Sequence, residues 1–426
     1  MSTKQHDDLP HTFRRIGLLL GNEYAWPLAY EALIERLGSH LNYQGRRFDF
    51  EVERLTIEPF NLRQPVRHHV IIDRLGYWHM TVREWLKKSA LMDDSHTVNN
   101  PFTFQSMEKH SAYCVMIRLG FDIPETWLVP QKEWDPKDER ARVTAENYHK
   151  MFDLEKIVEE VGGYPVFMKP YDGGGWRGVT HIKNREDLYK AYDESGQQTM
   201  HIQKGIKDYE IFCRCLGCGP QILPMRYDPD QPLHNRYRIE HGFLSPFQGD
   251  YVVKLTRIIN AFFGWEYNSC ESLLRGKSIF PIDFANAVPD TSLISLHYYF
   301  PWAIKALVRW SLYCAVTERK TRIDLQSRDY FAIADRDIPF PEKLNLYHDL
   351  AQRYFESERF EVFCASHLAH LDELTLEYFS SAAWDATLVE RCRRSFPAHE
   401  HEQFIAHYRG LINYWVKTEQ DRLAKH

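Results

Sequence analysis

Short apolar runs alternate with helical patterns in the first hundred residues. The apolar run 16–20 ends at Gly21-Asn22, and apolar positions then recur at helical spacing over residues 25–37. A second strand-like run, residues 70–73, follows a polar connection. Strands that alternate with helices predict an α/β layer built on a parallel sheet, here over residues 1–95.

Two loops follow the predicted strands of this layer. They are Gly21-Asn22-Glu23 and Asp73-Arg74-Leu75. The carboxyl ends of parallel strands are where such sheets meet their ligands, so both loops are candidate ligand contacts. Ordinary surface turns explain the same residues equally well.

The pattern from residue 96 to residue 290 is different. A helical stretch over 99–119 is followed by predicted strands at 127–129, 163–182 (a strand, a turn and a strand), 200–203 and 210–216, with a charged helix at 185–192. Few crossover helices separate these strands, which favours a mainly antiparallel sheet.

Residues 291–426 show helical spacing almost throughout. Large apolar side chains recur three and four positions apart, as in Leu346, Tyr347, Leu350, Ala351 and Tyr354. This spacing predicts a helical C-terminal region. Its aromatic residues are interpreted as core rather than as a cofactor site.

Composition narrows the possible classes of protein. The chain has 426 residues, 44% of them hydrophobic, which is enough for two to four folded domains. The net charge is −6 with 53 basic and 59 acidic residues, so nucleic acid is not expected as a partner. No apolar run reaches the ~20 residues that span a bilayer, and residues 1–15 do not resemble a secretory signal. A cytoplasmic protein without a membrane partner is expected.

Eight cysteines are spread along the chain, and three of them cluster: Cys213, Cys215 and Cys218. Their spacing leaves a zinc site open. However, Cys213 and Cys215 are two positions apart in a predicted strand and share a face, and no histidine nearby completes a tetrahedral set. Buried structural thiols are the favoured interpretation.

The strongest local motif is a strand that carries Lys169 into the glycine loop Gly173-Gly174-Gly175. Glycines let the backbone fold over phosphate groups and donate N–H groups to them, and a lysine at the entrance neutralises phosphate charge. Glycine-rich hairpins that bind nothing are also common. Phosphate binding is the favoured hypothesis.

A second motif lies about a hundred residues further on. Glu271 leads a predicted strand, residues 275–277 make a turn, and Asp283 and Asn286 follow on the returning strand. The hairpin would bring both carboxylates and the amide oxygen to one end, and such oxygens are ligands that Mg²⁺ prefers. A surface hairpin with unrelated acids is the alternative.

The order of these motifs from residue 99 to residue 286 resembles the ATP-grasp superfamily, which includes glutathione synthetase-like and D-alanine–D-alanine ligase-like enzymes. The resemblance implies a mixed α/β and α+β fold. Residues 1–95 would form the α/β pre-ATP-grasp domain and residues 96–290 the ATP-grasp domain, with nucleotide between its two subdomains. Residues 291–426 would be an added helical region.

The resemblance also implies roles for single residues. Those expected to contact ATP are Lys109 and Lys169 at the phosphates, Gly173, Gly174 and Gly175 in the loop over the triphosphate, Gln203, Lys204 and Ile206 at the adenine hinge, and Glu210 at the ribose. Glu271 and Asn286 match metal ligands for Mg²⁺ or Mn²⁺. The family usually has a glutamate where this chain has Phe284, so the second carboxylate is assigned to Asp283.

In the family, ATP phosphorylates a carboxylate, and an amine or a thiol attacks the resulting acyl phosphate. Arginines between the hinge and the metal hairpin often hold the oxyanion, because a guanidinium binds oxyanions through two parallel hydrogen bonds. Arg236 and Arg238 are the candidates, since they would share one face of an extended segment. Arg226 is interpreted as a loop charge.

The sequence therefore predicts an ATP-dependent carboxylate–amine ligase that makes an amide or peptide bond from small substrates. Two alternatives remain: a small-molecule kinase of the same fold, and a non-catalytic nucleotide-binding scaffold. The helical region 291–426 could serve as a homo-oligomer interface or recruit a carrier partner.

Overall fold

A computed structural model gives the fold and describes residues 9–38, 41–135, 137–141, 143, 151–174, 177–286 and 288–425. The chain forms two compact units. The first unit comprises Met1–Phe104, Arg214–Ser269 and Ala287–His426, and the second comprises Gln105–Cys213 and Cys270–Asn286. The division of the sequence at residues 95 and 290 stays a prediction.

The strands belong to three sheets. They are β1 His11–Leu19, β2 Leu41–Tyr43, β3 Arg46–Leu55, β4 Val70–Asp73, β5 His96–Val98, β6 Thr126–Val129, β7 Val166–Pro170, β8 Thr180–Ile182, β9 Met200–Lys204, β10 Ile211–Cys218, β11 Gln221–Tyr227, β12 Tyr237–Arg238, β13 Tyr267–Arg275 and β14 Ser278–Asp283.

Helices make up most of the remaining described chain. The α-helices are α1 Ala25–Leu37, α2 Met80–Met92, α3 Lys109–Leu119, α5 Leu154–Glu160, α6 Arg185–Ser195, α7 Pro246–Phe263, α8 Leu293–Leu296, α9 Phe300–Val316, α10 Ser327–Ala334, α11 Phe340–Phe355, α12 Ser357–His367, α13 Leu371–Phe379, α14 Ala382–Ser395 and α15 His401–Leu423. The 3₁₀ helices are η1 Pro101–Met107, η2 Leu233–Asn235, η3 His297–Tyr299 and η4 Ala398–Glu400. Among the described residues, none of the helices combines the length and apolar character that a bilayer crossing requires.

The sheet of the first unit has the strand order β2-β3-β1-β4-β5. Strand β1 pairs in parallel with β3 and β4, and β4 pairs in parallel with β5. Strand β2 pairs with β3 in antiparallel fashion. The predicted parallel layer is therefore confirmed for β3, β1, β4 and β5, together with the helix at 25–37 and the strand at 70–73.

Strand β3 corrects one expectation, because it lies in the segment interpreted as a polar connection. Its charged residues Arg47, Asp49 and Glu51 alternate with Phe48 and Phe50. The Arg15 guanidinium of β1 donates a hydrogen bond of 2.8 Å to Glu51. Alternation with one solvated face is a strand pattern, and the high charge concealed it.

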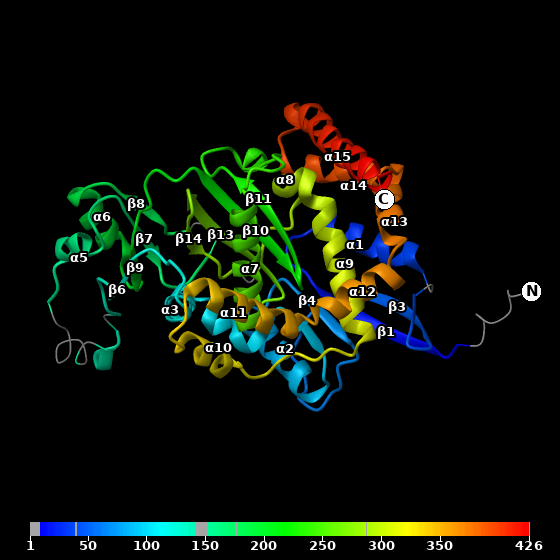
Figure 1. The fold of residues 1–426 in the computed structure, drawn as a ribbon, viewed down its shortest axis with the longest axis horizontal. Helices are drawn as coiled ribbons and strands as arrows, with labels where there is room; N and C mark the ends of the chain where they lie inside the picture. The colour runs from blue at the N-terminus through cyan, green and yellow to red at the C-terminus, as the bar shows by residue number, and fades with distance from the viewer. Residues whose placement is uncertain are drawn as a thin grey trace, which may run out of the picture. The chain divides into compact units, whose positions relative to one another are not determined.

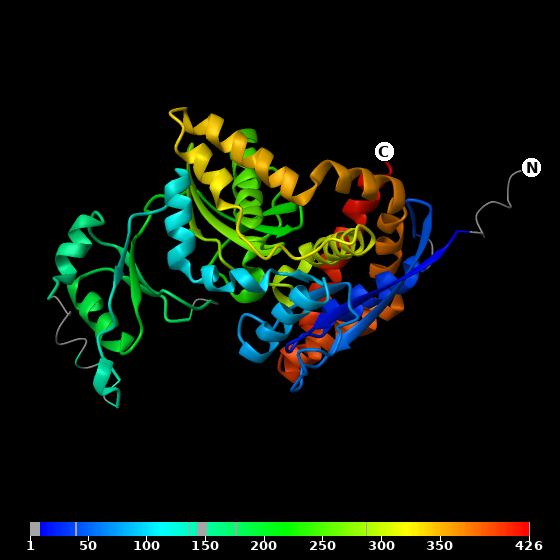
Figure 2. The ribbon, with the colours of Figure 1, turned by 90° about the horizontal axis from the view of Figure 1, so that it is seen from below.

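Helices fill the C-terminal region of the first unit, as predicted. Helix α1 packs against α9 and α13 (Figure 1). Helix α11 runs alongside α7, the two being the orange-yellow and green helices seen together in Figure 2. Of the residues whose spacing predicted these helices, Tyr347 and Ala351 are fully buried, and Leu346, Leu350 and Tyr354 are half-buried.

The second unit contains a four-stranded sheet with the order β6-β9-β7-β8, and all three of its strand pairs are antiparallel. Helices α5 and α6 cover it in Figure 1, and their apolar side chains share a core with Val166, Met168 and Ile202. A further sheet has the order β12-β11-β10-β13-β14. Its strands β10 and β13 each run from one unit into the other, and β13 and β14 form the predicted antiparallel hairpin. Cys213, Cys215 and Cys218 are buried in β10.

Candidate functional site

Strand β7 sends alternate side chains to opposite faces, and this places Lys169. Val166 and Met168 enter the core beneath α5 and α6, so Phe167 and Lys169 point to the other face. Lys169 is buried, and its Nζ donates a hydrogen bond of 2.7 Å to Oε1 of Gln203 on β9. The Gln203 amide in turn donates 2.8 Å to Thr126 Oγ1. Lys169 is thus held by a neutral, fixed acceptor.

Lys109 stands at the first position of α3 in the same unit. Its Nζ lies 3.3 Å from a carboxylate oxygen of Asp283 and donates a hydrogen bond of 3.1 Å to the carbonyl of Gly173. Burial lowers the pKa of Lys169 to about 8; Asp283 and Glu271 act against this shift, and Lys109 adds to it. Two cations and two carboxylates therefore gather in the second unit.

The carboxylates come from the β13–β14 hairpin. Glu271 and Asp283 are direct cross-strand partners, with a register shift between Glu271 and Ser272. Side chains directly opposite each other share a face of the sheet, so the predicted proximity of Glu271 and Asp283 is confirmed. Glu271 is buried, whereas the Asp283 side chain is 35% exposed.

Oxygen ligands for a divalent cation can come from this hairpin. Glu271 and Asp283 offer carboxylate oxygens and Asn286 an amide oxygen, a donor set that suits Mg²⁺. Phe284 takes no part, because it is 1% exposed and its ring packs 5.5 Å from that of Tyr113. The residues fit a magnesium ion with Asp283 as the second acid.

The hinge borders a pocket of about 420 Å³ in the second unit. Lys204, Gly205 and Ile206 line it, together with Arg275 and Phe280 of the hairpin. The backbone N–H of Glu210, just before β10, donates 2.9 Å to the carbonyl of Leu274, and a Glu210 carboxylate oxygen accepts from the N–H of Gly276 at 3.4 Å. Residues 204–206 thus line the pocket together with residues of the β13–β14 hairpin, and Glu210 is hydrogen-bonded to that hairpin.

The glycine loop is described in part. Gly173 has φ +124°, a backbone conformation that favours glycine, and its carbonyl accepts the bond from Lys109. Gly174 is half-buried, and Gly175 lies outside the described residues. The loop therefore begins beside the lysine pair.

The two arginines differ from expectation. Arg236 ends the 3₁₀ helix η2 with φ −68° and ψ −36°, and only Tyr237 and Arg238 are extended, so the two arginines do not share a strand face. Both residues belong to the first unit. Arg226 forms a surface ion pair of 2.8 Å with Glu240. It was expected in a loop but lies on strand β11, opposite Arg238 of β12.

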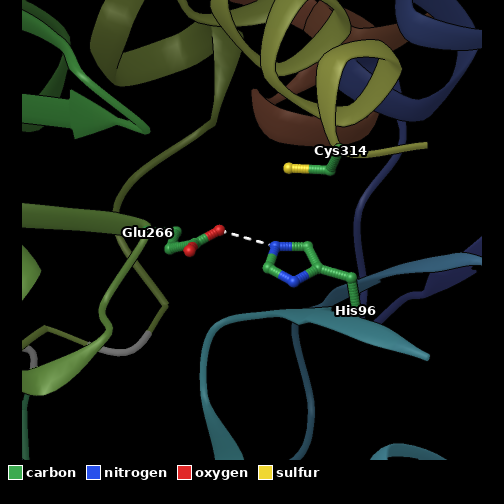
Figure 3. A group of neighbouring side chains, drawn as sticks. All are labelled: His96, Glu266 and Cys314. Atoms are coloured by element: carbon green, nitrogen blue, oxygen red, sulfur yellow. Dashed lines mark hydrogen bonds and ion pairs between the residues drawn. The ribbon is translucent and has the colours of Figure 1, made fainter. Parts of the chain in front are cut away.

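One group of titratable side chains was not anticipated. His96, Glu266 and Cys314 meet in the interior of the first unit, where the ring of His96 and the carboxylate of Glu266 point toward each other (Figure 3). The carboxylate also accepts hydrogen bonds from Trp310, Arg319 and Tyr354. Burial acts to raise the pKa of Glu266, but His96 and Arg319 hold it below its usual range.

Those donors occupy both oxygens of Glu266, and a guanidinium 3.1 Å away repels a cation. The group is therefore a buried ion network rather than a metal site. Glu266 is 170 positions from His96, so no local sequence signal marks it.

No family model matches the chain. The chain is 25% identical over 203 residues to a D-alanine–D-alanine ligase of Streptomyces griseus, covering 43% of this chain and 48% of that protein. It is 26% identical over 145 residues to the vancomycin B-type resistance protein VanB of Enterococcus faecalis, covering 34% and 36%. A shorter match, 42% over 48 residues, is to the cyanophycin synthetase of a Synechocystis species, of which it covers 6%. The chain thus spans about half or less of the curated relatives it matches.

Among solved structures, the chain resembles a RimK domain ATP-grasp protein of Sphaerobacter thermophilus with a TM-score of 0.48 and 13% identity, over 70% of this chain and 99% of that one. At that TM-score the likeness adds nothing to the sequence matches. The matches show that the chain is similar in sequence, over part of its length, to a D-alanine–D-alanine ligase and to VanB.

Proposed function

We propose that the protein is an ATP-dependent carboxylate–amine ligase that forms an amide or peptide bond through an acyl phosphate. The observation that carries the proposal is the gathering of Lys109, Lys169, Glu271 and Asp283 within one unit, with Lys109 and Asp283 3.3 Å apart. Lysines that neutralise phosphate beside oxygen ligands for a metal are what phosphoryl transfer from ATP requires.

Nucleotide binding divides between two parts of the second unit. Lys109 and Lys169 hold the phosphates, and the loop that begins at Gly173 covers them. The adenine base lies against the backbone of residues 203–206, beside the pocket of about 420 Å³, and Glu210 receives the ribose hydroxyls. The Gln203 side chain is bonded to Lys169 and Thr126, so it orients the lysine as well as bordering the base.

Glu271, Asp283 and Asn286 would hold Mg²⁺. When bound, this ion neutralises charge on the phosphates and polarises the bond that breaks. Lys109 connects the proposed metal ligands with the glycine loop, since it contacts both Asp283 and the carbonyl of Gly173. A metal at Asp283 would therefore adjoin the loop over the phosphates.

The reaction has two steps. A substrate carboxylate oxygen attacks the γ-phosphorus, an O–P bond forms, and the bond to ADP breaks. The amine nitrogen then attacks the acyl carbon, phosphate leaves with the bonding pair, and the nitrogen loses a proton. Lys109 and Lys169 offset the charge that develops on the transferring group.

The test is ADP release from ATP and Mg²⁺ with pooled amino acids and small carboxylic acids, followed by mass spectrometry of each pool that responds. A product whose mass equals two substrates less water supports the ligase. A phosphorylated single substrate, with no need for an amine, would instead establish the kinase.

Two lysine variants test whether ADP release depends on the proposed phosphate-binding site. Lys169→Ala should abolish ADP release, whereas Lys183→Ala, an exposed lysine of the same unit, should leave it unchanged. Equal activity in both variants would contradict the site assignment.

A further inference from the structure

Helix α3 contacts three consecutive residues of the β13–β14 hairpin and of the chain that leaves it. The Tyr113 hydroxyl donates a hydrogen bond of 2.7 Å to the carbonyl of Ile282. Lys109, four positions earlier, places its Nζ 3.3 Å from a carboxylate oxygen of Asp283. The Tyr113 ring packs 5.5 Å from the ring of Phe284, at an angle of 69°. One helix therefore holds Asp283 and both of its neighbours in the sequence.

Helical geometry explains why these contacts come together. Residues four apart on an α-helix lie on the same face, so Lys109 and Tyr113 reach the hairpin side by side. Both are buried, with 5% and 3% of their surface exposed. Helix α3 and residues 282–284 all belong to the second unit, so the arrangement is complete within it.

The Tyr113 side chain is itself held in place. Its ring makes edge-to-face contacts with two others, those of Phe284 and His201, and the centroid of the His201 ring lies 5.7 Å away. His201 is 1% exposed and lies on β9, directly opposite Lys169 of β7. A ring packed among such neighbours has little freedom to turn, so the hydroxyl is fixed relative to the Ile282 carbonyl.

Asp283 is the less supported of the two hairpin acids. It is the last residue of β14, and its side chain is 35% exposed, whereas Glu271 is buried within β13. The register of the hairpin also shifts between Glu271 and Ser272. Strand ends open more readily than strand interiors, so contacts from outside the sheet have a larger share in placing the Asp283 carboxylate.

We propose that Tyr113 is a positioning residue for the metal ion, because its hydroxyl and ring fix the backbone on both sides of Asp283 and thereby set the direction of that carboxylate. Tyr113 would not touch the ion. Groups that orient the ligands of a metal change its affinity without contacting it. The proposal rests on the proposed function, since it takes Asp283 to be a metal ligand.

A fixed carboxylate should favour one cation over another. Mg²⁺ requires nearly ideal octahedral geometry, whereas Ca²⁺ accepts more ligands in flexible arrangements. Loss of the Tyr113 hydroxyl should therefore weaken the binding of Mg²⁺ more than that of Ca²⁺. A general loss of stability would not change the preference between the two cations.

The test removes the hydroxyl and keeps the ring. Mn²⁺ is titrated into the full chain without nucleotide, its binding is followed by the loss of the electron paramagnetic resonance signal of free Mn²⁺, and Mg²⁺ and Ca²⁺ are measured by competition. Tyr113→Phe should weaken Mg²⁺ binding roughly threefold to tenfold, as expected for one lost hydrogen bond. Ca²⁺ binding should weaken less. An unchanged preference for Mg²⁺ over Ca²⁺ overturns the proposal.

Tyr192→Phe is the matched control. Tyr192 is a buried tyrosine of α6 in the same unit, and its hydroxyl donates 3.1 Å to the carbonyl of Pro130. This variant loses the same kind of hydrogen bond away from the hairpin, so it should bind both cations as the wild type does. A preference for Mg²⁺ that falls equally in the two variants would leave Tyr113 with a structural role only.

The metal site, the positioning role and the ligase can fail separately. A wild type that takes up no Mn²⁺, or that binds it no better than Asp283→Asn, overturns the metal site and the role of Tyr113 with it. Mn²⁺ binding that Asp283→Asn weakens, with a cation preference that Tyr113→Phe leaves unchanged, overturns the positioning role alone. If Tyr113→Phe changes the preference while no pool of substrates yields an amide, the positioning role stands and the ligase does not.

Discussion

Lys169 donates its hydrogen bond of 2.7 Å to the neutral side-chain oxygen of Gln203. A neutral acceptor satisfies the buried ammonium without cancelling its charge, so the charge remains for a phosphate. Burial nevertheless lowers the pKa of Lys169 to about 8, near the working range of an enzyme.

Metal-free nucleotide affinity should therefore depend on pH. Below pH 8 Lys169 carries its proton and attracts phosphate; as pH rises through 8 the free protein loses that proton, and affinity for ADP should fall by about tenfold for each further pH unit. Calorimetric titration with ADP in EDTA between pH 7 and pH 9 measures this. Lys169→Arg, which cannot lose its charge, should flatten the profile; the same slope in both proteins would assign the titration elsewhere.

Replacing Gln203 by glutamate should move that transition. In Gln203→Glu a carboxylate takes the place of the amide oxygen, stabilises the ammonium and raises the pKa of Lys169, so the fall in ADP affinity shifts to higher pH. Gln198→Glu, a substitution outside the Lys169 contacts, is the matched control. A profile unchanged by Gln203→Glu would mean that the bond to Lys169 does not set its charge.

The carboxylates of the hairpin should govern the requirement for metal. Asp283→Asn and Glu271→Gln each remove one anionic ligand and should raise the Mg²⁺ concentration that gives half-maximal ADP release. Asp193→Asn alters a surface acid of the same unit, paired with Lys132, and serves as control. A common Mg²⁺ dependence in all three variants would remove the hairpin from the metal site.

Replacing Phe284 by the glutamate that related proteins usually carry at this position should destabilise the protein. Its side chain is 1% exposed and packs against Tyr113, so Phe284→Glu would bury a carboxylate and lower the free energy of unfolding by roughly 3 kcal/mol or more. Urea denaturation measures the loss, with Phe284→Leu as the apolar control. A stable Phe284→Glu protein that binds Mg²⁺ more tightly would show that Asp283 is a poor substitute.

The sequence predicted what local patterns determine. The helix over residues 25–37 and the strand over 70–73 have clear apolar periodicity, and the turn at 275–277 sets Glu271 opposite Asp283. Strand β3 was not predicted, because its many charged residues are typical of a polar loop. The prediction that Arg236 lies in an extended segment was wrong, because the three-residue 3₁₀ helix before it is too short to leave a periodic pattern in the sequence.

Contacts between distant segments could not be predicted. Tyr113 bonds to the carbonyl of Ile282 although 169 positions separate them. The bonds of Gln203 to Lys169 and Thr126 also depend on strand register, which sequence spacing alone does not give. The contacts that could be found only in the structure are thus those that set the charge of Lys169 and those that hold the residues beside Asp283.

Glu266 provides a test of stability that is independent of the site. Its carboxylate bonds to His96, Trp310, Arg319 and Tyr354 in the interior, so Glu266→Gln leaves Arg319 buried without its counter-charge and should cost about 3–5 kcal/mol. Glu84→Gln removes an exposed partner of Lys87 and should change stability by less than ~1 kcal/mol. Urea midpoints of the two variants compare the costs directly, and a Glu266→Gln midpoint equal to that of Glu84→Gln would show that the buried network contributes nothing net.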